Sequence, residues 1–153
     1  MQPVIRDSGA STDVGRLRQS NEDALLMAEP VYAVADGMGG ARAGEVASAM
    51  AVAALHGFAG GEQQLAETIE DVNRRIHRAA LADASLQGMG TTLTAAMVEG
   101  DTLVIAHVGD SRAYVLRAGH LHQITDDHSL VGELIRRGAL TPEEALRHPQ
   151  RSV

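Results

Sequence analysis

The amino-acid sequence predicts one α+β domain in which two helices precede a block of antiparallel strands. Three observations support this class. Apolar residues recur at helical spacing in two consecutive segments within residues 44–76, a β-type pattern follows over residues 91–124, and turn residues divide that block into short runs. A chain of 153 residues with 44% hydrophobic residues can bury one core.

The elements before residue 80 begin with two strands. Residues 24–35, ALLMAEPVYAVA, predict two short strands joined by a Glu29-Pro30 turn, and they lead into the glycine-rich segment DGMGG. Two amphipathic helices are expected next, the first within residues 44–58 and unusually apolar. Their apolar faces comprise Val46, Met50, Ala53 and Ala54 in the first helix, and Leu65, Ile69, Val72 and Ile76 in the second.

Turn spacing predicts an antiparallel meander in the strand block, with strands at 91–98, 103–108, 113–117 and 121–124. The chain then returns to helix over residues 129–137, and Gly138 ends that segment. A further helix is expected to begin at Thr141, because Thr141 can act as N-cap, Pro142 suits the first helical position and Glu144 can complete a capping box.

Composition excludes several classes of site. The chain has no cysteine, so disulfides, thiolate nucleophiles and cysteine-bound metals are excluded, and a metal would need oxygen or imidazole ligands. A net charge of −7 disfavours a phosphate-backbone binder, so no nucleic-acid partner is expected. The sequence has no apolar run of eighteen residues and no secretion-signal pattern at its start, from which we expect a cytoplasmic protein.

Two aspartates follow apolar strands directly and stand beside glycine. Asp36 follows VYAVA, and Asp110 follows TLVIAHV and Gly109. Each one alone is also typical of an Asp-Gly turn, whereas together they could converge on one hard cation. Residues 15–23 add the neighbouring acids Glu22 and Asp23 and also Arg18, whose planar guanidinium suits phosphate oxygens. A cationic fork beside a carboxylate-bound metal indicates phosphoester hydrolysis.

These residues lie in stretches that resemble the metal-dependent phosphatases called PPM or PP2C, and most closely their bacterial members. The tail PEEALRHPQRSV is similar to the flap region of that family and to the segment after the flap, so the resemblance covers nearly the entire chain. Four stretches carry it in the family's order: GRLRQSNEDA (15–24), VADGMGGARAGEVAS (34–48), GMGTTLTAAMV (88–98) and AHVGDSRAYVLRAGHLHQITDDHS (106–129).

The resemblance implies a role for each matched residue. Asp36 would bridge two Mn²⁺ or Mg²⁺ ions, and the carbonyl of Gly37 would be a further ligand. Asp23, with Glu22 beside it, would hold metal-bound waters, Arg18 would bind the substrate phosphate, and Asp110 would contribute to a third metal site. Two such ions about 3.5–4 Å apart can lower the pKa of a shared water from about 15.7 toward about 7.

The histidines receive no catalytic role. Eukaryotic members place a general-acid histidine directly after the DG pair, whereas Met38 stands there in this sequence, as in bacterial relatives. The proton donor therefore stays unassigned. His107 in a strand and His56 and His77 on helices are interpreted as structural. His120, His122 and His128 stand near Asp126 and Asp127, and they are interpreted as part of a solvated loop that leads into the flap rather than as a metal site.

The family's fold is an antiparallel β-sandwich flanked by helix pairs. Its members also use two aspartates from SDG-type and GG-x-DN-type motifs, which do not occur in this sequence. We therefore expect a single truncated PP2C-like domain over residues 1–153, incomplete at its C-terminal end, with a flap-like segment at about 126–150. As it stands, the chain is expected to be inactive or very weak.

The leading hypothesis is hydrolysis of phosphoserine and phosphothreonine on proteins in a bacterial pathway that opposes a Ser/Thr kinase. Its partners would be the kinase or the substrates of the kinase, with no membrane contact in this segment and a monomeric state. One alternative is a non-catalytic pseudo-phosphatase or phosphoprotein-binding regulatory domain. Another is a related phosphatase that acts on an anti-sigma-factor antagonist.

Overall fold

The computed structural model of the chain describes residues 5, 7–39 and 43–148. Residues 40–42 of the glycine-rich stretch and residues 149–153 of the tail, both of which carry part of the family resemblance, lie outside the described residues. The chain divides into two compact units, Met1–His107 and Val108–Val153. Antiparallel strands and separate helices confirm the α+β class.

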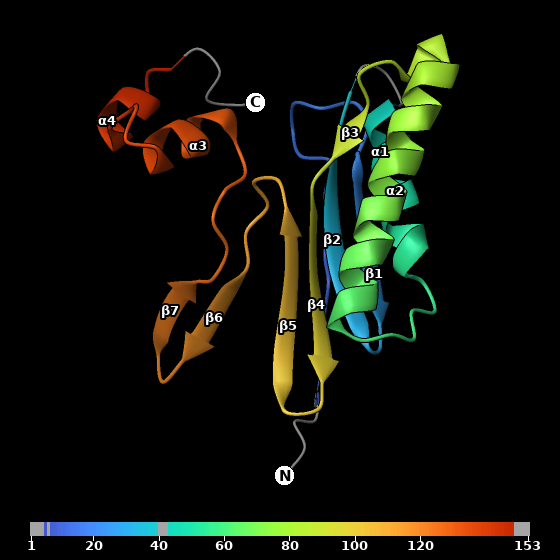
Figure 1. The fold of residues 1–153 in the computed structure, drawn as a ribbon, viewed down its shortest axis with the longest axis vertical. Coiled ribbons are helices and arrows are strands. Elements are labelled where there is room, and N and C mark those ends of the chain that lie inside the picture. Colours follow the sequence, from blue (N-terminus) through green and yellow to red (C-terminus); the bar gives the residue numbers. More distant parts are fainter. Residues whose placement is uncertain (1–4, 6, 40–42, 149–153) are drawn as a thin grey trace. The chain divides into compact units, whose positions relative to one another are not determined.

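The first unit contains a sheet in the order β1-β2-β4-β5, with the short strand β3 also paired to β2 (Figure 1). The two-residue turn Glu29-Pro30 joins β1 and β2 as predicted. Strand β2 pairs antiparallel with both β1 and β4, so the strands on its two sides come from distant parts of the sequence. The strands are β1 (Asp23–Ala28), β2 (Val31–Met38), β3 (Gly90–Thr91), β4 (Leu93–Glu99) and β5 (Thr102–Val108).

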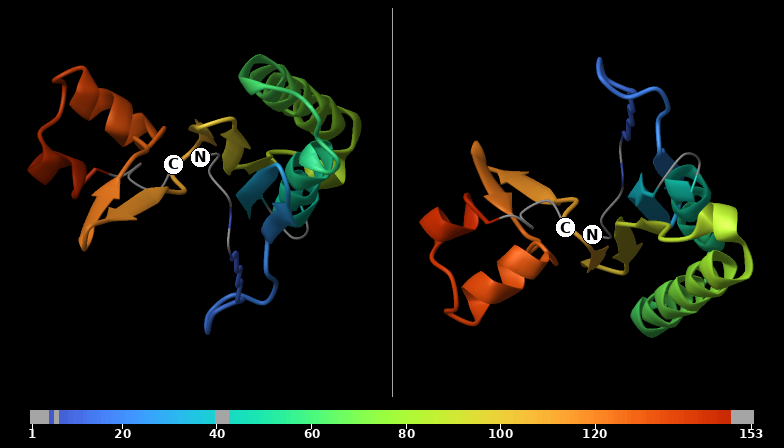
Figure 2. Two further views of the ribbon diagram at one scale, coloured as in Figure 1. Left: turned by 90° about the horizontal axis from the view of Figure 1, so that it is seen from below. Right: turned by 90° about the horizontal axis from the view of Figure 1, so that it is seen from above.

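Both long helices of this unit lie on the same face of its sheet (Figure 2). Helix α1 (Ala43–Leu55) packs against β1 and β2, and helix α2 (Glu62–Ala82) packs against α1. Small side chains make the close approach of α1 possible, since Ala47 and Ala51 are fully buried. A short 3₁₀ helix, Ala84–Leu86, leads from α2 toward β3.

Strand β2 shows why the sheet has one covered face. Val31, Ala33 and Ala35 are buried beneath the helices, whereas the alternate residues Val34 and Asp36 are exposed. This period of two is the signature of a strand with one face in the core. The core is completed mainly by Leu26, Ala51, Leu55, Leu65, Leu93, Ala95 and Met97.

The second unit contains the last two strands of the predicted meander. Strands β6 (Tyr114–Arg117) and β7 (His120–Gln123) pair antiparallel with each other in a two-stranded sheet. The φ of Gly109, between β5 and β6, is 102°, a conformation that favours glycine. His120 and His122 therefore lie on a strand, not in a loop, with their ring centroids 6.4 Å apart.

Two short helices follow in the second unit, and both begin as the sequence predicts. Helix α3 (Leu130–Arg136) starts after Ser129, whose hydroxyl accepts a hydrogen bond of 3.0 Å from the amide of Gly132. Helix α4 (Pro142–Ala145) follows Thr141, whose amide donates to the Glu144 carboxylate at 2.8 Å. No described helix is both long and apolar enough to span a bilayer.

Candidate metal-binding site

Two aspartates face each other at one end of the first unit's sheet. The register of β1 and β2 pairs Asp23 directly with Asp36, and both side chains are exposed. Residues directly opposite in an antiparallel pair project to the same face, with their Cβ atoms about 4.5–5.5 Å apart. Like charges in this arrangement repel each other. A bound cation would convert that repulsion into attraction.

Hydrogen bonds with β3 and the residue after it fix the main chain of Asp36. The Asp36 amide donates to the Thr92 hydroxyl at 3.0 Å, and the Thr92 amide donates back to the Asp36 carbonyl at 2.9 Å. The Thr91 hydroxyl also donates to the Asp36 carbonyl at 3.1 Å. The main chain of Asp36 is therefore held from the β3 side, and its carboxylate projects from an anchored backbone.

A loop holds Asp23 in a different way. The Thr12 hydroxyl donates to the Asp23 carboxylate at 2.9 Å, and the Asn21 side-chain amide donates to the same hydroxyl oxygen at 2.8 Å. The Asn21 carboxamide oxygen also accepts from the Asp23 backbone amide at 3.0 Å. These bonds restrict the rotamer of Asp23 while one of its carboxylate oxygens receives the threonine hydrogen bond.

Gly37 brings the Glu22 segment and the start of α1 close together. Its amide donates to the Glu22 carbonyl at 3.1 Å, and that carbonyl also accepts from the buried Ser48 hydroxyl at 2.6 Å. A Cβ on Gly44 would stand 2.9 Å from both the Glu22 carboxyl carbon and the Gly37 carbonyl carbon. Those two carbons thus lie within about 6 Å of each other, because each is that close to a common point. The Glu22 carboxylate and the Gly37 carbonyl therefore place oxygen atoms near each other at this point.

Arg18 stands in the exposed loop that precedes β1. Its side chain makes no ion pair within residues 5, 7–39 and 43–148. The guanidinium is therefore not neutralised by a described carboxylate, as a phosphate-binding arginine requires.

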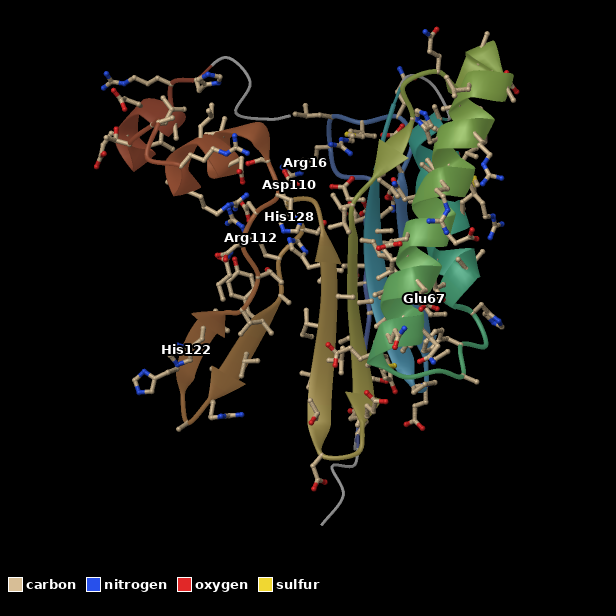
Figure 3. All side chains as sticks on the ribbon, viewed as in Figure 1. Arg16, Glu67, Asp110, Arg112, His122 and His128 are labelled. Atoms are coloured by element: carbon tan, nitrogen blue, oxygen red, sulfur yellow. The ribbon has the colours of Figure 1, made fainter. Side chains whose placement is uncertain are left out.

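Asp110 belongs to the second unit, where it follows Gly109 in an exposed turn (Figure 3). Two neighbouring contacts anchor this turn. The His128 amide donates to the Gly109 carbonyl at 2.7 Å, and Arg112 makes a bidentate pair with Asp127 at 2.8 and 2.6 Å. The Asp127 carboxylate raises the pKa of Arg112 further above its ordinary value.

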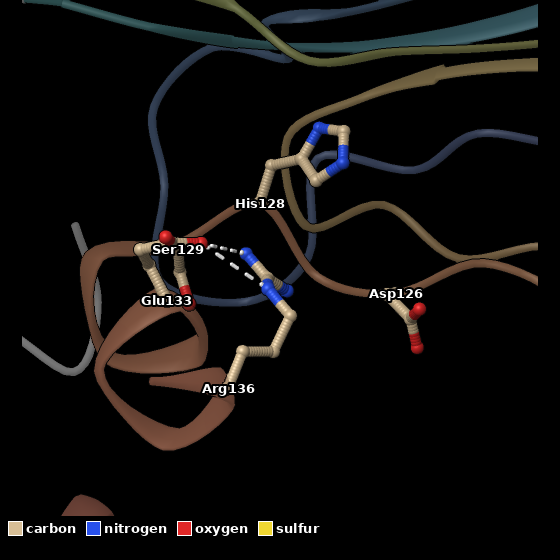
Figure 4. A pocket seen from close by; sticks show the side chains of 5 residues that line it. All are labelled: Asp126, His128, Ser129, Glu133 and Arg136. Atoms are coloured by element: carbon tan, nitrogen blue, oxygen red, sulfur yellow. Dashed lines mark hydrogen bonds and ion pairs between the residues drawn. The ribbon is translucent and has the colours of Figure 1, made fainter. Parts of the chain in front are cut away.

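An open pocket of about 620 Å³ lies in the same unit, lined by Asp126, His128, Ser129, Glu133 and Arg136 (Figure 4). The Arg136 guanidinium donates to the Glu133 carboxylate at 2.8 and 3.2 Å. Arg136 and Arg137 together lower the pKa of Glu133. The positive charge in this pocket is compensated internally, so the pocket is a poor candidate for binding a phosphate.

The donors around Asp36 fit a hard cation only in part. Asp23, Asp36 and the Gly37 carbonyl supply oxygen, which Mg²⁺ and Mn²⁺ prefer, and such ions retain several waters. Among the described residues, however, no three carboxylate or histidine side chains are grouped closely enough to hold a metal by themselves. His120 and His122 also lack a third such neighbour in the part of the chain that is described.

A comparison with protein families identifies the family to which the chain belongs. The protein phosphatase 2C family model matches residues 16–152. This chain belongs to that family. Asp36 on β2 and the turn at Asp110 both fall within the matched residues, and the antiparallel sheet with its paired helices has the fold that the PP2C resemblance implies.

Bacterial PP2C phosphatases are similar to the chain in sequence and in structure. The serine/threonine phosphatase stp of Listeria monocytogenes is 45% identical over 157 residues, a match that covers 93% of this chain and 62% of stp. The crystal structure of the Mycobacterium tuberculosis serine/threonine phosphatase PstP/Ppp matches with a TM-score of 0.79 at 44% identity, covering 91% of this chain and 62% of that one.

A third match contains metal. The PstP catalytic domain in complex with two manganese ions has a TM-score of 0.75 and 43% identity, covering 86% of this chain and 60% of that one. The chain thus spans about three-fifths of the length of these relatives.

Several residues at the PP2C site received no role from the sequence. Thr12, Ser48, Thr91 and Thr92 hold Asp23, the Glu22 carbonyl and Asp36 in place. Ser48, Thr91 and Thr92 lie in stretches that resemble the family, VADGMGGARAGEVAS and GMGTTLTAAMV, and that resemblance was the available signal. Nothing in the sequence marked Thr12, because its contact depends on the path of a loop eleven residues long.

Proposed function

We propose that this chain forms part of a metal-dependent phosphatase that hydrolyses phosphoserine and phosphothreonine monoesters on proteins. The observation that carries the proposal is the placement of Asp23 opposite Asp36, beside the closely packed Gly37. Two carboxylates held on one face of a strand pair repel each other, and a divalent ion between them removes that cost.

Each residue has a distinct task in this proposal. Asp36 and the Gly37 carbonyl would hold Mn²⁺ or Mg²⁺, and Asp23 and Glu22 would orient water on the ion. A bound pair of such ions activates water and neutralises the charge that develops on the phosphoryl group. Arg18 would bind and orient the phosphate through its two-pronged guanidinium. Asp110 would contribute to a third cation site, and residues 126–150 would serve as a flap.

Support for the substrate class comes from the named relatives, which are serine/threonine phosphatases. Phosphoproteins, including a Ser/Thr kinase or its substrates, are accordingly the proposed partners. We place the reaction in the cytoplasm and propose a monomer. Residues 1–153 are proposed to belong to one PP2C-like domain.

The test uses the protein that carries these 153 residues, with p-nitrophenyl phosphate and a phosphothreonine peptide as substrates. We expect hydrolysis to require added Mn²⁺ and to stop with EDTA. Replacing Asp36 with Asn should lower kcat/KM at least about 100-fold, because even the outer partners of metal ligands contribute about 10–100-fold. Asp101→Asn, in the exposed turn before β5, is the matched control and should leave the rate unchanged.

Arg18→Lys should separate binding from metal chemistry. A lysine keeps the charge but loses the fork, so we expect a raised KM with metal dependence retained. If the protein binds Mn²⁺ and phosphopeptide but hydrolyses neither substrate, the regulatory pseudo-phosphatase becomes the better account. If Asp36→Asn leaves a metal-dependent rate intact, the assignment of this site is wrong.

A further inference from the structure

A second pocket, of about 420 Å³, lies within the first unit between the C-terminal half of α2 and the segment that leads into β3. Its lining is mostly apolar, with Ile76, Ala80 and Leu81 from α2 and Met89 from the facing segment. Ile76 and Met89 are buried, whereas Leu81 is 75% exposed. The pocket thus has an apolar base, and part of its rim leaves large apolar groups in water.

No aspartate, glutamate, lysine or arginine is among the described residues that line this pocket, unlike the pocket of the second unit. Its polar lining residues are the neutral side chains Asn73, Gln87 and Thr91, together with His77. An occupant with a full charge would lose hydration there without gaining a partner, which is costly. The chemistry of the lining therefore selects an apolar group.

Met38 and Thr91 bring the pocket near the main chain of Asp36. Met38 lines it and follows Asp36 by two residues in β2, a rise of roughly 6.5–7 Å along a strand. Thr91, which also lines it, donates its hydroxyl hydrogen to the Asp36 carbonyl at 3.1 Å. The wall of the pocket and the backbone of the candidate metal ligand are therefore joined directly.

Met38 forms an exposed wall of the pocket. It is the register partner of Gly90, and a Cβ on Gly90 would stand 2.8 Å from the Met38 terminal methyl. The glycine therefore gives the methionine room to lie across β3. Met38 is 63% exposed, and an unbranched thioether adapts its shape to different apolar partners.

We propose that this pocket is a substrate subsite that accepts an apolar side chain two residues from the phosphorylated serine or threonine. An extended peptide advances at most about 3.3–3.6 Å per residue, so two residues cover the distance from Asp36 to Met38. Residues two apart also project in the same direction. This inference rests on the proposed phosphatase function and adds a sequence preference to it.

The experiment compares phosphothreonine peptides with leucine or serine at the second position before or after the phosphoresidue. At one of these positions, leucine should give about tenfold higher kcat/KM than serine, in line with the selectivity of apolar enzyme pockets. Leu81→Ser and Ala80→Phe should reduce this ratio to about 1–2, the first by removing apolar wall and the second by filling the pocket. Leu103→Ser, on exposed β5, is the control and should keep the tenfold ratio.

The outcomes separate the two proposals. Equal kcat/KM for the leucine and serine peptides, with Mn²⁺-dependent hydrolysis of p-nitrophenyl phosphate intact, would overturn the subsite and leave the phosphatase. If both pocket variants keep the tenfold preference for leucine over serine, the leucine side chain is recognised outside this pocket and the subsite is wrong. A change in p-nitrophenyl phosphate hydrolysis by N-acetyl-leucinamide, without any peptide preference, would identify an effector pocket instead. No hydrolysis of p-nitrophenyl phosphate at all would overturn the proposed function and the subsite with it.

Discussion

Replacing Gly37 with alanine tests how tightly the candidate site is built. The added Cβ would overlap the Gly44 carbonyl group and would stand 2.7 Å from the Glu22 carbonyl oxygen. All of these atoms are main chain, so no side-chain rotation relieves the contact. Even the Glu22 contact is 0.7 Å short of the 3.4 Å at which ordinary van der Waals contact begins. The start of α1 must therefore move away from β2.

The cost of Gly37→Ala follows from two effects. Overpacking a filled interior costs about 1–3 kcal/mol, and rigid neighbours place this site near the upper end. Separation would also weaken the hydrogen bond from the Gly37 amide to the Glu22 carbonyl, which contributes about 1 kcal/mol. We expect the free energy of unfolding to fall by about 3–4 kcal/mol. With a typical urea dependence, the midpoint should fall by about 1–4 M.

Urea unfolding followed by far-ultraviolet circular dichroism measures this change. Gly9→Ala is the matched control, because its added Cβ meets nothing within 4 Å and its φ lies outside the glycine-favoured region. That variant should be neutral or slightly more stable. A Gly37→Ala protein that unfolds within about 0.5 M of the parent, half of the smallest expected shift, would refute the close packing at this glycine.

Two further predictions concern the contacts of single side chains. Ser48→Ala removes the 2.6 Å hydrogen bond to the Glu22 carbonyl, which retains its bond from Gly37, so unfolding in urea should show a loss of about 1 kcal/mol rather than the larger cost of an orphaned group. The pKa of Glu144 is lowered by hydrogen bonds from the Thr141 amide and hydroxyl. The ionised Glu144 carboxylate therefore stabilises the start of α4 fully above its ordinary pKa of 4.5. That stabilisation is lost as the pH falls through the lowered pKa that Glu144 has in the folded protein. Cα chemical shifts of residues 142–145 should record that loss, and Glu144→Gln should remove it, whereas an equal effect of Glu143→Gln would contradict the assignment.

Local patterns predicted the secondary structure because each depends on nearby residues. The alternation in VYAVA and the Glu29-Pro30 turn were sufficient for β1 and β2, and the capping box at Thr141 was sufficient for α4. Turn spacing predicted the positions of the strands within residues 91–124, but strand positions alone do not determine strand partners.

The sequence names the residues of the candidate site, which stay a prediction, but it does not show which of them are neighbours. Adjacency in the sequence groups Asp23 with Glu22, whereas the structure pairs Asp23 with Asp36 and places the Glu22 carboxyl against Gly44. The Asp23 register follows from the two-residue turn, which sets Ala28 opposite Val31 and fixes every pair beyond it. The hydrogen bonds from Thr91 and Thr92 could not be predicted, because they depend on how two intervening helices pack.

The hydrogen bonds that join β3 and Thr92 to Asp36 on β2 have a consequence for how the site assembles as the chain folds. The hydrogen bonds that hold Asp36 close loops of 55 and 56 residues. Closing such a loop costs on the order of 3.5 kcal/mol of chain entropy before any contact is gained. Helices α1 and α2 can form locally first and shorten the effective loop, whereas β1 and β2 need only a hairpin. Asp23 and Asp36 can thus meet early on a growing chain, but Asp36 becomes rigid only after residue 92 has been synthesised. We therefore expect the site to bind a metal ion tightly only after the first unit has folded.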